Sequence, residues 1–510
     1  MGGRTPGTPR DAARALEAVE RRLGVLDRRI GLADWAMYTG TADERSVVHW
    51  QTVRAEYLRE PEHQRLLQRS TTSPGSSRAD RRTELLRRAV LDANVEQAPE
   101  IVRLRSRLQG RIVRFRPRWK GKRVGRVEVY EALRTSGDRG ERERAWRAEG
   151  PLQRSLEAPL RELIGLRNDR ARAAGFRSFA ELRLSFEGVP APKLRALAQA
   201  SAKPLAGLVG SLREETQRRT GDSHWAPWDL RFALEARAPL PKEPFPGERM
   251  VETVQRGLRS WGIPPARLDL RIVRCDLPFG GLTIAPRIPS DVRILVHPAG
   301  GWEYYMVLFH EYGHAVHFRT VDQPTHLLRN PDVGFAGFAE GVAGVFEQVA
   351  SDPAWLGTVR GLDPRVVAEF CRGRAEAAVL EAASVALGIE SELRLYERPD
   401  QDPRPAVRAL ARRWFRYDEY EARSWADSFF VTHPVYYQSY LLSQLFRAQV
   451  IDALRRETAG PLWPNRRAGP WLADAFLSAG ARYDWTDRLA EVTGRPLSAD
   501  AFVGTLNPSR

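Results

Sequence analysis

The amino-acid sequence predicts a mainly α-helical fold that contains one small β region. Apolar residues recur at helical spacing almost from the first residue, and arginine-rich amphipathic segments fill most of residues 79–187. Only one stretch, shortly before residue 300, has the composition of strands. Helical patterns resume at Trp302 and continue towards the end of the sequence. Helices should therefore form the framework, with a small sheet set among them.

The first predicted helix begins where Thr8 can act as a cap and Pro9 fits the first helical position. Its apolar residues follow at alternating spacings of three and four, so one face should be buried. These residues are Leu16, Val19, Leu23, Leu26 and Ile30. A cluster of Ser, Thr, Gly and Pro should break the pattern at residues 70–77, and further breaks are expected at residues 116–125 and 150–151.

Strand-type composition is confined to three short segments that follow a proline-rich loop at residues 238–247. These segments are LDLRIV (268–273), GGLTIA (280–285) and VRILVH (292–297). We expect them to form the small sheet. From Trp302 onward the sequence predicts helices, with breaks around residues 324–337, 399–405 and 461–470.

The composition narrows the kind of protein and the chemistry of any metal site. The chain has 510 residues, 42% of them apolar, which is enough for one large core or two adjoining ones. Its two cysteines, Cys275 and Cys371, cannot build a disulfide framework or a cysteine-based zinc module. Any metal must therefore be held by His and carboxylate. No stretch of 18 apolar residues and no signal-peptide pattern occurs, so we expect a cytoplasmic protein with no membrane partner.

The net charge of +16 raises the question of nucleic-acid binding. Lysine accounts for only 5 of the 80 basic residues, and the arginines are dispersed among acidic residues along the whole chain. The densest basic run, residues 103–126, could contact an anion, but a solvated face is the favoured interpretation. We therefore expect no nucleic-acid partner.

A candidate metal site lies in the apolar helical segment WEYYMVLFHEYGHAVHF, residues 302–318. It contains the sequence H-E-x-x-H, with histidines at His310 and His314. Residues four apart in a helix differ by about 40° in direction, so both imidazoles can bind one Zn²⁺. Glu311 points slightly aside, where its carboxylate can act as a general base without ligating the metal. The alternative is a pair of hydrogen-bonded core histidines.

A catalytic zinc needs a third protein ligand, and the apolar segment GFAGFAEGVAGVFEQVA, residues 334–350, is the best source. Glu340 is the predicted ligand, because an isolated acid in an apolar helix is costly unless it binds a cation. Glu347, on the same face, is the predicted support of a ligand imidazole. Gly341 and Gly344 are expected to let this helix approach the histidine helix closely. His317, one turn past His314, is a competing ligand candidate.

Tyrosines cluster in the segment THPVYYQSYLLSQLF, residues 432–446. Pro434 marks a predicted helix start, and Tyr437 and Tyr440 then share one face of that helix. Phenol hydroxyls are suitable donors to the oxyanion that forms during attack on a carbonyl group. A tyrosine pair at helical spacing is also a common core feature, so this pattern alone leaves both interpretations open.

These segments resemble the thimet oligopeptidase and oligoendopeptidase F family of zinc peptidases and, more distantly, angiotensin-converting enzyme. HEYGHAVH is similar to the family's H-E-F-G-H-x-x-H block, and GFAEGVAGVFE to its third-ligand block, which favours Glu340 as ligand. Tyr437-Gln438-Ser439-Tyr440 is similar to the Y-x-x-Y block, whose second tyrosine stabilises the oxyanion. Further similar segments are LRNDRARAAGFRSFAELRL (166–184), PWDLRF (227–232) and YDWTDRLAEVTGRPLSADAF (483–502).

The resemblance implies a zincin-like fold with two helical halves that enclose a deep substrate channel. We place the N-terminal half at residues 1–190 and the catalytic half at residues 191–510, with the small sheet beside the H-E-x-x-H helix. Gly280, Gly281, Leu282 and Thr283 are the predicted substrate-binding residues, because an edge strand there would pair with the peptide backbone. A narrow channel would admit short peptides and exclude folded proteins.

The chain departs from these families at two points. His433 precedes Tyr440 by only seven residues, a shorter gap than the family's substrate-binding histidine shows. Gly344 stands where angiotensin-converting enzyme carries an Asp, so support for the ligands is assigned to Glu347 instead.

The predicted function is zinc-dependent hydrolysis of peptide bonds, with one Zn²⁺ per chain and Glu311 as general base. Tyr440 is the predicted oxyanion donor, and His433 and Tyr437 are further catalytic candidates. The alternative is a catalytically inactive zinc-binding homologue that binds peptides. Internal cleavage and release of C-terminal dipeptides are equally compatible with the sequence, which predicts no oligomeric state.

Overall fold

The structure, a computed structural model, describes residues 9–69, 78–235, 240–277, 279–330, 336–420 and 425–505. The chain divides into two compact units, each built from segments that are distant in the sequence. Unit 1 comprises residues 1–97, 241–361 and 446–497, and unit 2 comprises residues 98–240, 362–445 and 498–510. No boundary between the units falls at residue 190, where the sequence places the division. The predicted cap Thr8 and the predicted break at residues 70–77 lie outside the described residues.

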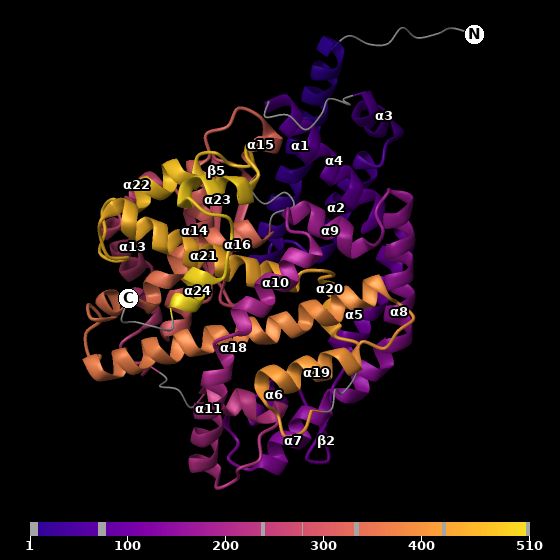
Figure 1. Ribbon diagram of the computed structural model, residues 1–510. Helices are drawn as coiled ribbons and strands as arrows, with labels where there is room; N and C mark the ends of the chain where they lie inside the picture. The colour runs from indigo at the N-terminus through magenta and orange to yellow at the C-terminus, as the bar shows by residue number, and fades with distance from the viewer. Residues whose placement is uncertain are drawn as a thin grey trace. The chain divides into compact units, whose positions relative to one another are not determined.

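Unit 1 combines helices with a three-stranded sheet, and Figure 1 labels most of its elements. Its elements before the sheet are α1 (Pro9–Tyr38), α2 (Glu44–Leu58), α3 (Pro61–Arg69), α4 (Arg78–Val95), η2 (Gly247–Arg249), α13 (Met250–Ser260) and η3 (Pro265–Arg267). The sheet contains β3 (Arg271–Arg274), β4 (Gly281–Arg287) and β5 (Asp291–Val296). After it come α14 (Trp302–Thr320), α15 (His326–Arg329), α16 (Ala336–Glu347), η4 (Gln348–Ser351), α17 (Pro353–Leu356), α22 (Ala468–Leu472), η5 (Ala473–Leu477) and α23 (Trp485–Thr493).

Unit 2 is helical apart from one short hairpin. Its first elements are α5 (Pro99–Arg114), β1 (Arg118–Trp119), β2 (Lys122–Arg123), α6 (Arg126–Thr135), α7 (Arg139–Ala148), α8 (Gly150–Ala173), α9 (Phe179–Glu187), α10 (Ala191–Ala202) and α11 (Leu205–Thr220). The remaining ones are η1 (Pro227–Asp229), α12 (Leu230–Glu235), α18 (Pro364–Glu397), α19 (Arg404–Phe415), α20 (Ser428–Thr432) and α24 (Asp500–Gly504). Helix α21 (Tyr437–Thr458) contains the boundary between Leu445 and Phe446.

The mainly α-helical fold predicted from the sequence is confirmed, together with the three strands and most of the breaks. At residues 150–151, for example, α7 ends at Ala148 and α8 begins at Gly150. The predicted helix start at Pro434 is wrong, because α21 begins three residues later, at Tyr437. Val435 has a φ angle of 49° in the left-handed region, so the chain cannot be helical there.

The β1–β2 hairpin was predicted only as a break in the helical pattern. Its turn residues Lys120 and Gly121 have φ angles of 47° and 80°. Two consecutive left-handed residues suit the tight turn of a two-residue hairpin. Because each strand has only two residues, the alternation of apolar and polar side chains that identifies a strand is too short to recognise.

The sheet of unit 1 has the strand order β3-β5-β4, with β3 parallel and β4 antiparallel to β5. Strand β4 is therefore an edge strand within the described residues. One sheet face packs against α1, where Trp35 joins a buried cluster with Ile284 and Leu295. The other face packs against α14, where Thr283 lies within hydrogen-bond distance of Glu311. The two helices thus cover opposite faces of the sheet.

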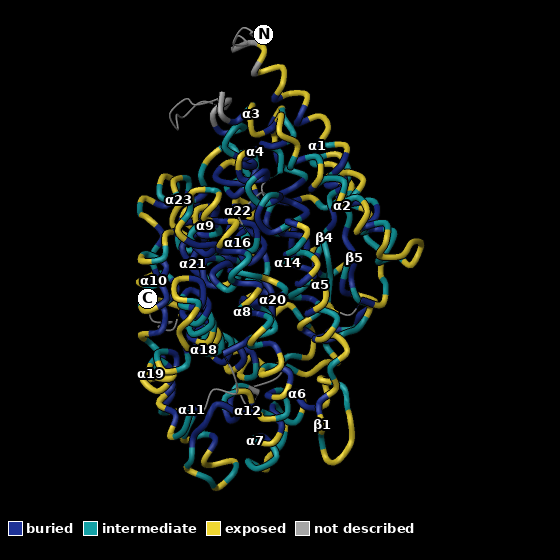
Figure 2. Tube along the Cα trace, turned by 90° about the vertical axis from the view of Figure 1, so that its right-hand side faces the viewer, coloured by how far each residue is buried: buried dark blue, intermediate teal, exposed yellow. Residues whose placement is uncertain are grey.

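Helix α14 is apolar on most sides because other elements of unit 1 surround it. It packs against the sheet, α13 and, most extensively, α16. Figure 2 shows the α14 and α16 segments coloured largely as buried. The contact between α14 and α16 is so close that a Cβ atom on Gly313 would lie 2.7 Å from Cα of Ala343. The glycine of the H-E-x-x-H sequence is therefore what permits the approach.

The predicted role of Gly341 and Gly344 in that approach is wrong. A Cβ atom on Gly341 would meet the Phe446 ring at 2.6 Å, and one on Gly344 would meet Cδ of Arg447 at 3.2 Å. Both glycines therefore face α21. Ala343 and Glu347, three and seven residues after Glu340, are residues of α16 that contact α14.

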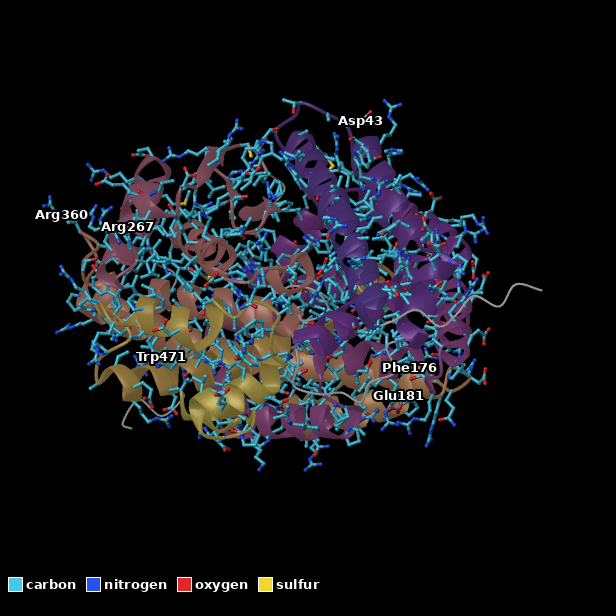
Figure 3. All side chains as sticks on the ribbon, turned by 90° about the horizontal axis from the view of Figure 1, so that it is seen from above. Asp43, Phe176, Glu181, Arg267, Arg360 and Trp471 are labelled. Atoms are coloured by element: carbon cyan, nitrogen blue, oxygen red, sulfur yellow. The ribbon has the colours of Figure 1, made fainter. Side chains whose placement is uncertain are left out.

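None of the helices in the described part of the chain is both long and apolar enough to cross a bilayer. Basic side chains are dispersed over the elements of both units, and many nitrogen-tipped side chains point outward in Figure 3, Arg267 and Arg360 among them. This dispersal follows from the even spread of arginine along the sequence.

Candidate metal centre

The three predicted metal ligands converge in unit 1. His310 and His314 come from adjacent turns of α14, and Glu340 comes from the facing helix α16. One donor atom from each of the three lies within 4.8 Å of the other two. Nε2 of His310 is 3.1 Å from Nε2 of His314 and 3.4 Å from Oε2 of Glu340.

These distances fit a tetrahedral zinc ion. Ligand atoms bonded at about 2.0–2.1 Å to a tetrahedral Zn²⁺ are about 3.3 Å from one another. The two short distances from Nε2 of His310 lie close to that value. Two imidazoles and one carboxylate are also the donor set of many catalytic zinc sites, where a fourth position takes water or substrate. The residues present therefore fit a single Zn²⁺.

Glu347 contacts the other nitrogen of the first histidine. Its Oε2 atom is 3.1 Å from Nδ1 of His310, while Nε2 of the same ring faces His314 and Glu340. A carboxylate that accepts a hydrogen from Nδ1 fixes the tautomer in which Nε2 offers its lone pair to a metal. This is the geometry that the predicted supporting role of Glu347 requires.

The ionisation of these groups reflects their mutual contacts. Burial disfavours the charge on His310, but hydrogen bonds with Glu340 and Glu347 outweigh it and raise the pKa of His310 to about 10. Burial lowers the pKa of His314 to about 4, and the neighbouring His310 adds to that effect. Burial also opposes the charge of Glu340, yet the hydrogen bond with His310 lowers its pKa. His310 therefore holds a proton that a cation bound at Nε2 displaces.

Glu311 lies beside the three ligands but is held by the sheet. It is 7% exposed, and the hydroxyl of Thr283 on β4 lies 2.7 Å from its Oε2 atom and 2.9 Å from its backbone oxygen. Burial raises the pKa of Glu311, although His310 and Thr283 favour the charged form. A carboxylate with a raised pKa, fixed by one oxygen, suits a general base at neutral pH.

The four predicted substrate-binding residues lie where β4 begins, on the edge of the sheet. Gly280 and Gly281 approach α14 so closely that added Cβ atoms would lie 2.9 Å from Val307 and Glu311, respectively. Leu282 points to the opposite face, where it packs against the cluster that contains Trp35. The glycines and Thr283 therefore set the position of Glu311, and the backbone of β4 runs past it.

The competing ligand candidate His317 lies apart from this group. It is 1% exposed, and its ring packs against Phe338 and Phe318. Burial lowers its pKa to about 3, so the ring is neutral. His317 does not belong to the metal-ligating group of the described residues.

The tyrosine segment belongs to unit 2. The Tyr437 hydroxyl donates to Oδ2 of Asp427 at 2.9 Å, and burial and this acid raise its pKa. Tyr440 is 39% exposed, and its ring lies 6.5 Å from that of Tyr437. His433 stacks on Phe429, with its Nδ1 atom 2.8 Å from the Thr432 hydroxyl. The Tyr437 hydroxyl is thus committed to a partner within the unit.

Sequence reasoning missed four residues that shape these sites. Gly313 sets the spacing between α14 and α16, Arg447 contacts Glu347, Asp427 accepts from Tyr437, and Glu392 accepts from the backbone N–H of Val435. Only Asp427 carries a local signal, since an Asp before a helix often caps it, and its Oδ1 atom accepts from Phe429 N at 2.9 Å. Gly313, Arg447 and Glu392 contact residues more than 25 positions away in the sequence, so no local pattern identifies them.

A comparison of the sequence with models of known protein families gives no match, and neither does a comparison with curated proteins.

Proposed function

We propose that this protein is a zinc-dependent peptidase that hydrolyses peptide bonds in short peptides. The observation that carries the proposal is the convergence of Nε2 of His310, Nε2 of His314 and a carboxylate oxygen of Glu340 within 4.8 Å of one another. Glu311, on the same helix, stands beside them without joining the group. This is the arrangement that a metal-assisted hydrolysis requires, with three ligands and a separate base.

Each residue has a defined task in the proposed reaction. Zn²⁺, held by His310, His314 and Glu340, would lower the pKa of a bound water and polarise the scissile carbonyl group. Glu311 accepts the proton of the water, while its Oε2 atom is held by the Thr283 hydroxyl. The protonated Glu311 then returns this proton to the leaving amine.

The edge position of β4 supports a peptide substrate. An extended peptide can add to the edge of a sheet by backbone hydrogen bonds, which bind it without regard to its side chains. Because Thr283 of β4 holds Glu311, a peptide paired with this strand would lie near the base. The zincin-like arrangement, the two halves around a channel and the preference for short peptides rest on the family resemblance.

Tyr440 is the proposed donor to the oxyanion, by its place in the Y-x-x-Y pattern. Its ring is 39% exposed, whereas the hydroxyl of Tyr437 is bonded to Asp427. The bond between the Tyr437 hydroxyl and Asp427 supports the choice of Tyr440 over Tyr437. His433 remains a second candidate, and burial lowers its pKa, which favours the neutral ring.

We also propose a cytoplasmic location without nucleic-acid partners. Neither Cys275 nor Cys371 forms a disulfide bond within the described residues, which suits a reducing compartment. The dispersal of arginine among acidic residues argues against a nucleic-acid footprint.

A fluorogenic peptide assay tests the function directly. A chelator should abolish cleavage, and added Zn²⁺ should restore it. Glu311→Gln should keep its zinc content and lose about 100- to 10,000-fold in kcat. Tyr440→Phe should lose about 100- to 1000-fold. Tyr483→Phe, which alters an equally exposed tyrosine of unit 1, should leave cleavage unchanged.

Two results would overturn the proposal. Cleavage that survives complete removal of zinc would exclude the metal centre as the active site. Zinc binding and peptide binding without any cleavage would instead support the inactive homologue that acts as a peptide-binding protein.

A further inference from the structure

We infer that Arg447 is a positioning residue of the metal centre, which acts through Glu347 on the ligand His310. The inference rests on the proposed function, since it assigns a role in the same site. It adds a residue that no sequence motif identifies, because Arg447 lies 100 positions after Glu347 in the chain.

The contacts form a chain of three side chains within unit 1. Nη1 of Arg447 on α21 is 3.4 Å from Oε1 of Glu347, and Oε2 of Glu347 is 3.1 Å from Nδ1 of His310. The two oxygens of one carboxylate therefore serve two partners. The Nε2 atom of the same imidazole faces the other two ligands. Arg447 is thus linked to the metal position through one acid and one ring.

The fold makes room for this contact at Gly344. A Cβ atom on Gly344 would lie 3.2 Å from Cδ of Arg447, so the arginine stem crosses α16 at this glycine on its way to Glu347. Any larger residue would push the stem aside. Gly344 therefore leaves the space that the Arg447 side chain needs to reach Glu347.

Because the three side chains are partly buried, the ion pair between Arg447 and Glu347 should be stronger than one on the surface. The side chains of Arg447, Glu347 and His310 are 18%, 22% and 21% exposed, respectively. Charges at such positions interact more strongly than exposed ones, because less water screens them. The guanidinium holds one oxygen of the Glu347 carboxylate. The other oxygen then stays directed at Nδ1 of His310.

The Glu347 oxygen that accepts from Nδ1 affects how well His310 can bind a metal ion. With its hydrogen on Nδ1, His310 presents a lone pair at Nε2, and a fixed ring orientation lowers the cost of binding a cation. Loss of Arg447 removes one of the contacts that fix the Glu347 carboxylate, so the support of His310 weakens. We therefore expect Arg447 to raise the affinity for zinc without touching it.

The test measures zinc affinity of the full-length protein by competition with a chromogenic chelator. Arg447→Met keeps the length and apolar stem of the side chain but removes its charge. It should weaken zinc binding about tenfold, the lower end of the range for residues that support metal ligands. Arg447→Lys, which restores a cation, should recover most of this affinity. Arg455→Met, on the exposed side of the same helix, is the matched control and should leave affinity unchanged.

A double-mutant cycle separates positioning from a merely structural contact. Glu347→Gln alone should weaken zinc binding about 10- to 100-fold. If Arg447 acts through Glu347, adding Arg447→Met to that variant should change affinity by less than about twofold. A full tenfold loss in both backgrounds would show that Arg447 acts by another route and would overturn the inference. Equal affinity of the Arg447→Met and wild-type proteins would overturn it as well.

The outcome is independent of peptidase activity. Tighter zinc binding by wild type than by Arg447→Met supports the inference even if no peptide is cleaved. Cleavage with unaltered zinc affinity in Arg447→Met leaves the proposed function intact and removes the inference alone. A wild-type protein that binds no zinc overturns both.

Discussion

Glu392 is the buried acid in unit 2 whose ionisation the structure changes most clearly. It is 2% exposed on α18, and its Oε1 atom accepts a hydrogen bond of 2.7 Å from the backbone N–H of Val435. Burial raises its pKa to about 8, although that hydrogen bond favours the charged form. Glu392 thereby fixes the strained residue Val435, which lies just before the tyrosines of that segment. It is the protonated form that does so at neutral pH.

This ionisation predicts how stability changes with pH. Between the ordinary pKa of about 4.5 in the unfolded chain and about 8 in the folded protein, the folded state binds the extra proton. The free energy of unfolding should therefore fall as pH rises from 5 to 8, by on the order of 1 kcal/mol per pH unit. Glu392→Gln, whose amide oxygen still accepts from Val435, should remove this slope.

Denaturant unfolding at pH 5, 6.5 and 8 measures the effect. The stability of Glu392→Gln relative to wild type should grow with pH. Glu369→Gln, an exposed acid on the same helix, should show a constant difference from wild type. Parallel curves for Glu392→Gln and wild type would show that Glu392 does not titrate in this range.

At the level of single residues, the sequence predicts what local spacing controls. His310, His314 and Glu311 follow from helix geometry alone, and Glu340 and Glu347 follow from the rarity of acids in an apolar helix. Thr283 is predicted to bind substrate through its backbone, and the structure adds a contact of its hydroxyl with Glu311. That contact, like those of Arg447 and Asp427, depends on which elements pack together, and side-chain type alone does not reveal it.

Helices α14 and α16 carry the metal ligands, and their separation is set at one position. A Cβ atom on Gly313 would lie 2.7 Å from Cα of Ala343, which is backbone and cannot rotate away. The helices would have to move apart, and Glu340 would move with α16. Gly313 is thus required for the approach of the third ligand as well as for packing.

Gly313→Ala should therefore weaken both stability and zinc binding. Overpacking of this kind typically costs about 1–3 kcal/mol, and the displaced Glu340 should weaken zinc affinity in addition. Thermal unfolding and chelator competition measure the two effects. Gly165→Ala in α8 is the matched control, since an added Cβ atom there meets nothing within 4 Å. It should stabilise the protein by about 0.5–1 kcal/mol. A Gly313→Ala protein with wild-type zinc affinity would contradict this account of the helix pair.

The order and type of the helices and strands can be predicted from the sequence, but which of them pack against one another cannot. Periodicity identifies the apolar stripe of α16, and it places Glu340 and Glu347 on one face. It does not tell whether α14 or α21 covers the stripe that contains Gly341 and Gly344, which is why their role was predicted wrongly. Short elements such as the two-residue strands β1 and β2 give no periodic signal at all.

At the scale of the whole molecule, the chain passes repeatedly between two compact units. Unit 1 takes three separate segments, residues 1–97, 241–361 and 446–497, and unit 2 takes the segments between and after them. A sequence-based division at residue 190 assumes that each half is contiguous. Contacts between segments far apart in the sequence determine the units instead, and composition shifts along the chain do not report such contacts.

This interleaving predicts that residues 1–190 do not fold when expressed alone. The fragment contains α1–α4 of unit 1 and α5–α9 of unit 2, and it completes neither. Asp27 would lose its 2.7 Å contact with His326, and the buried Arg167 would lose two of its acceptors, the backbone oxygens of Phe430 and Val431. A buried cation without acceptors costs several kcal/mol.

Thermal unfolding followed by circular dichroism, together with amide hydrogen exchange, tests this on the fragment and on the full chain. The full chain should unfold cooperatively. The fragment should lose helical signal gradually and exchange its amides rapidly, because isolated helices are marginally stable without tertiary packing. A sharp transition with protected amides in the fragment would show that residues 1–190 form a domain of their own, and the contacts across the sequence would then stabilise an already folded half.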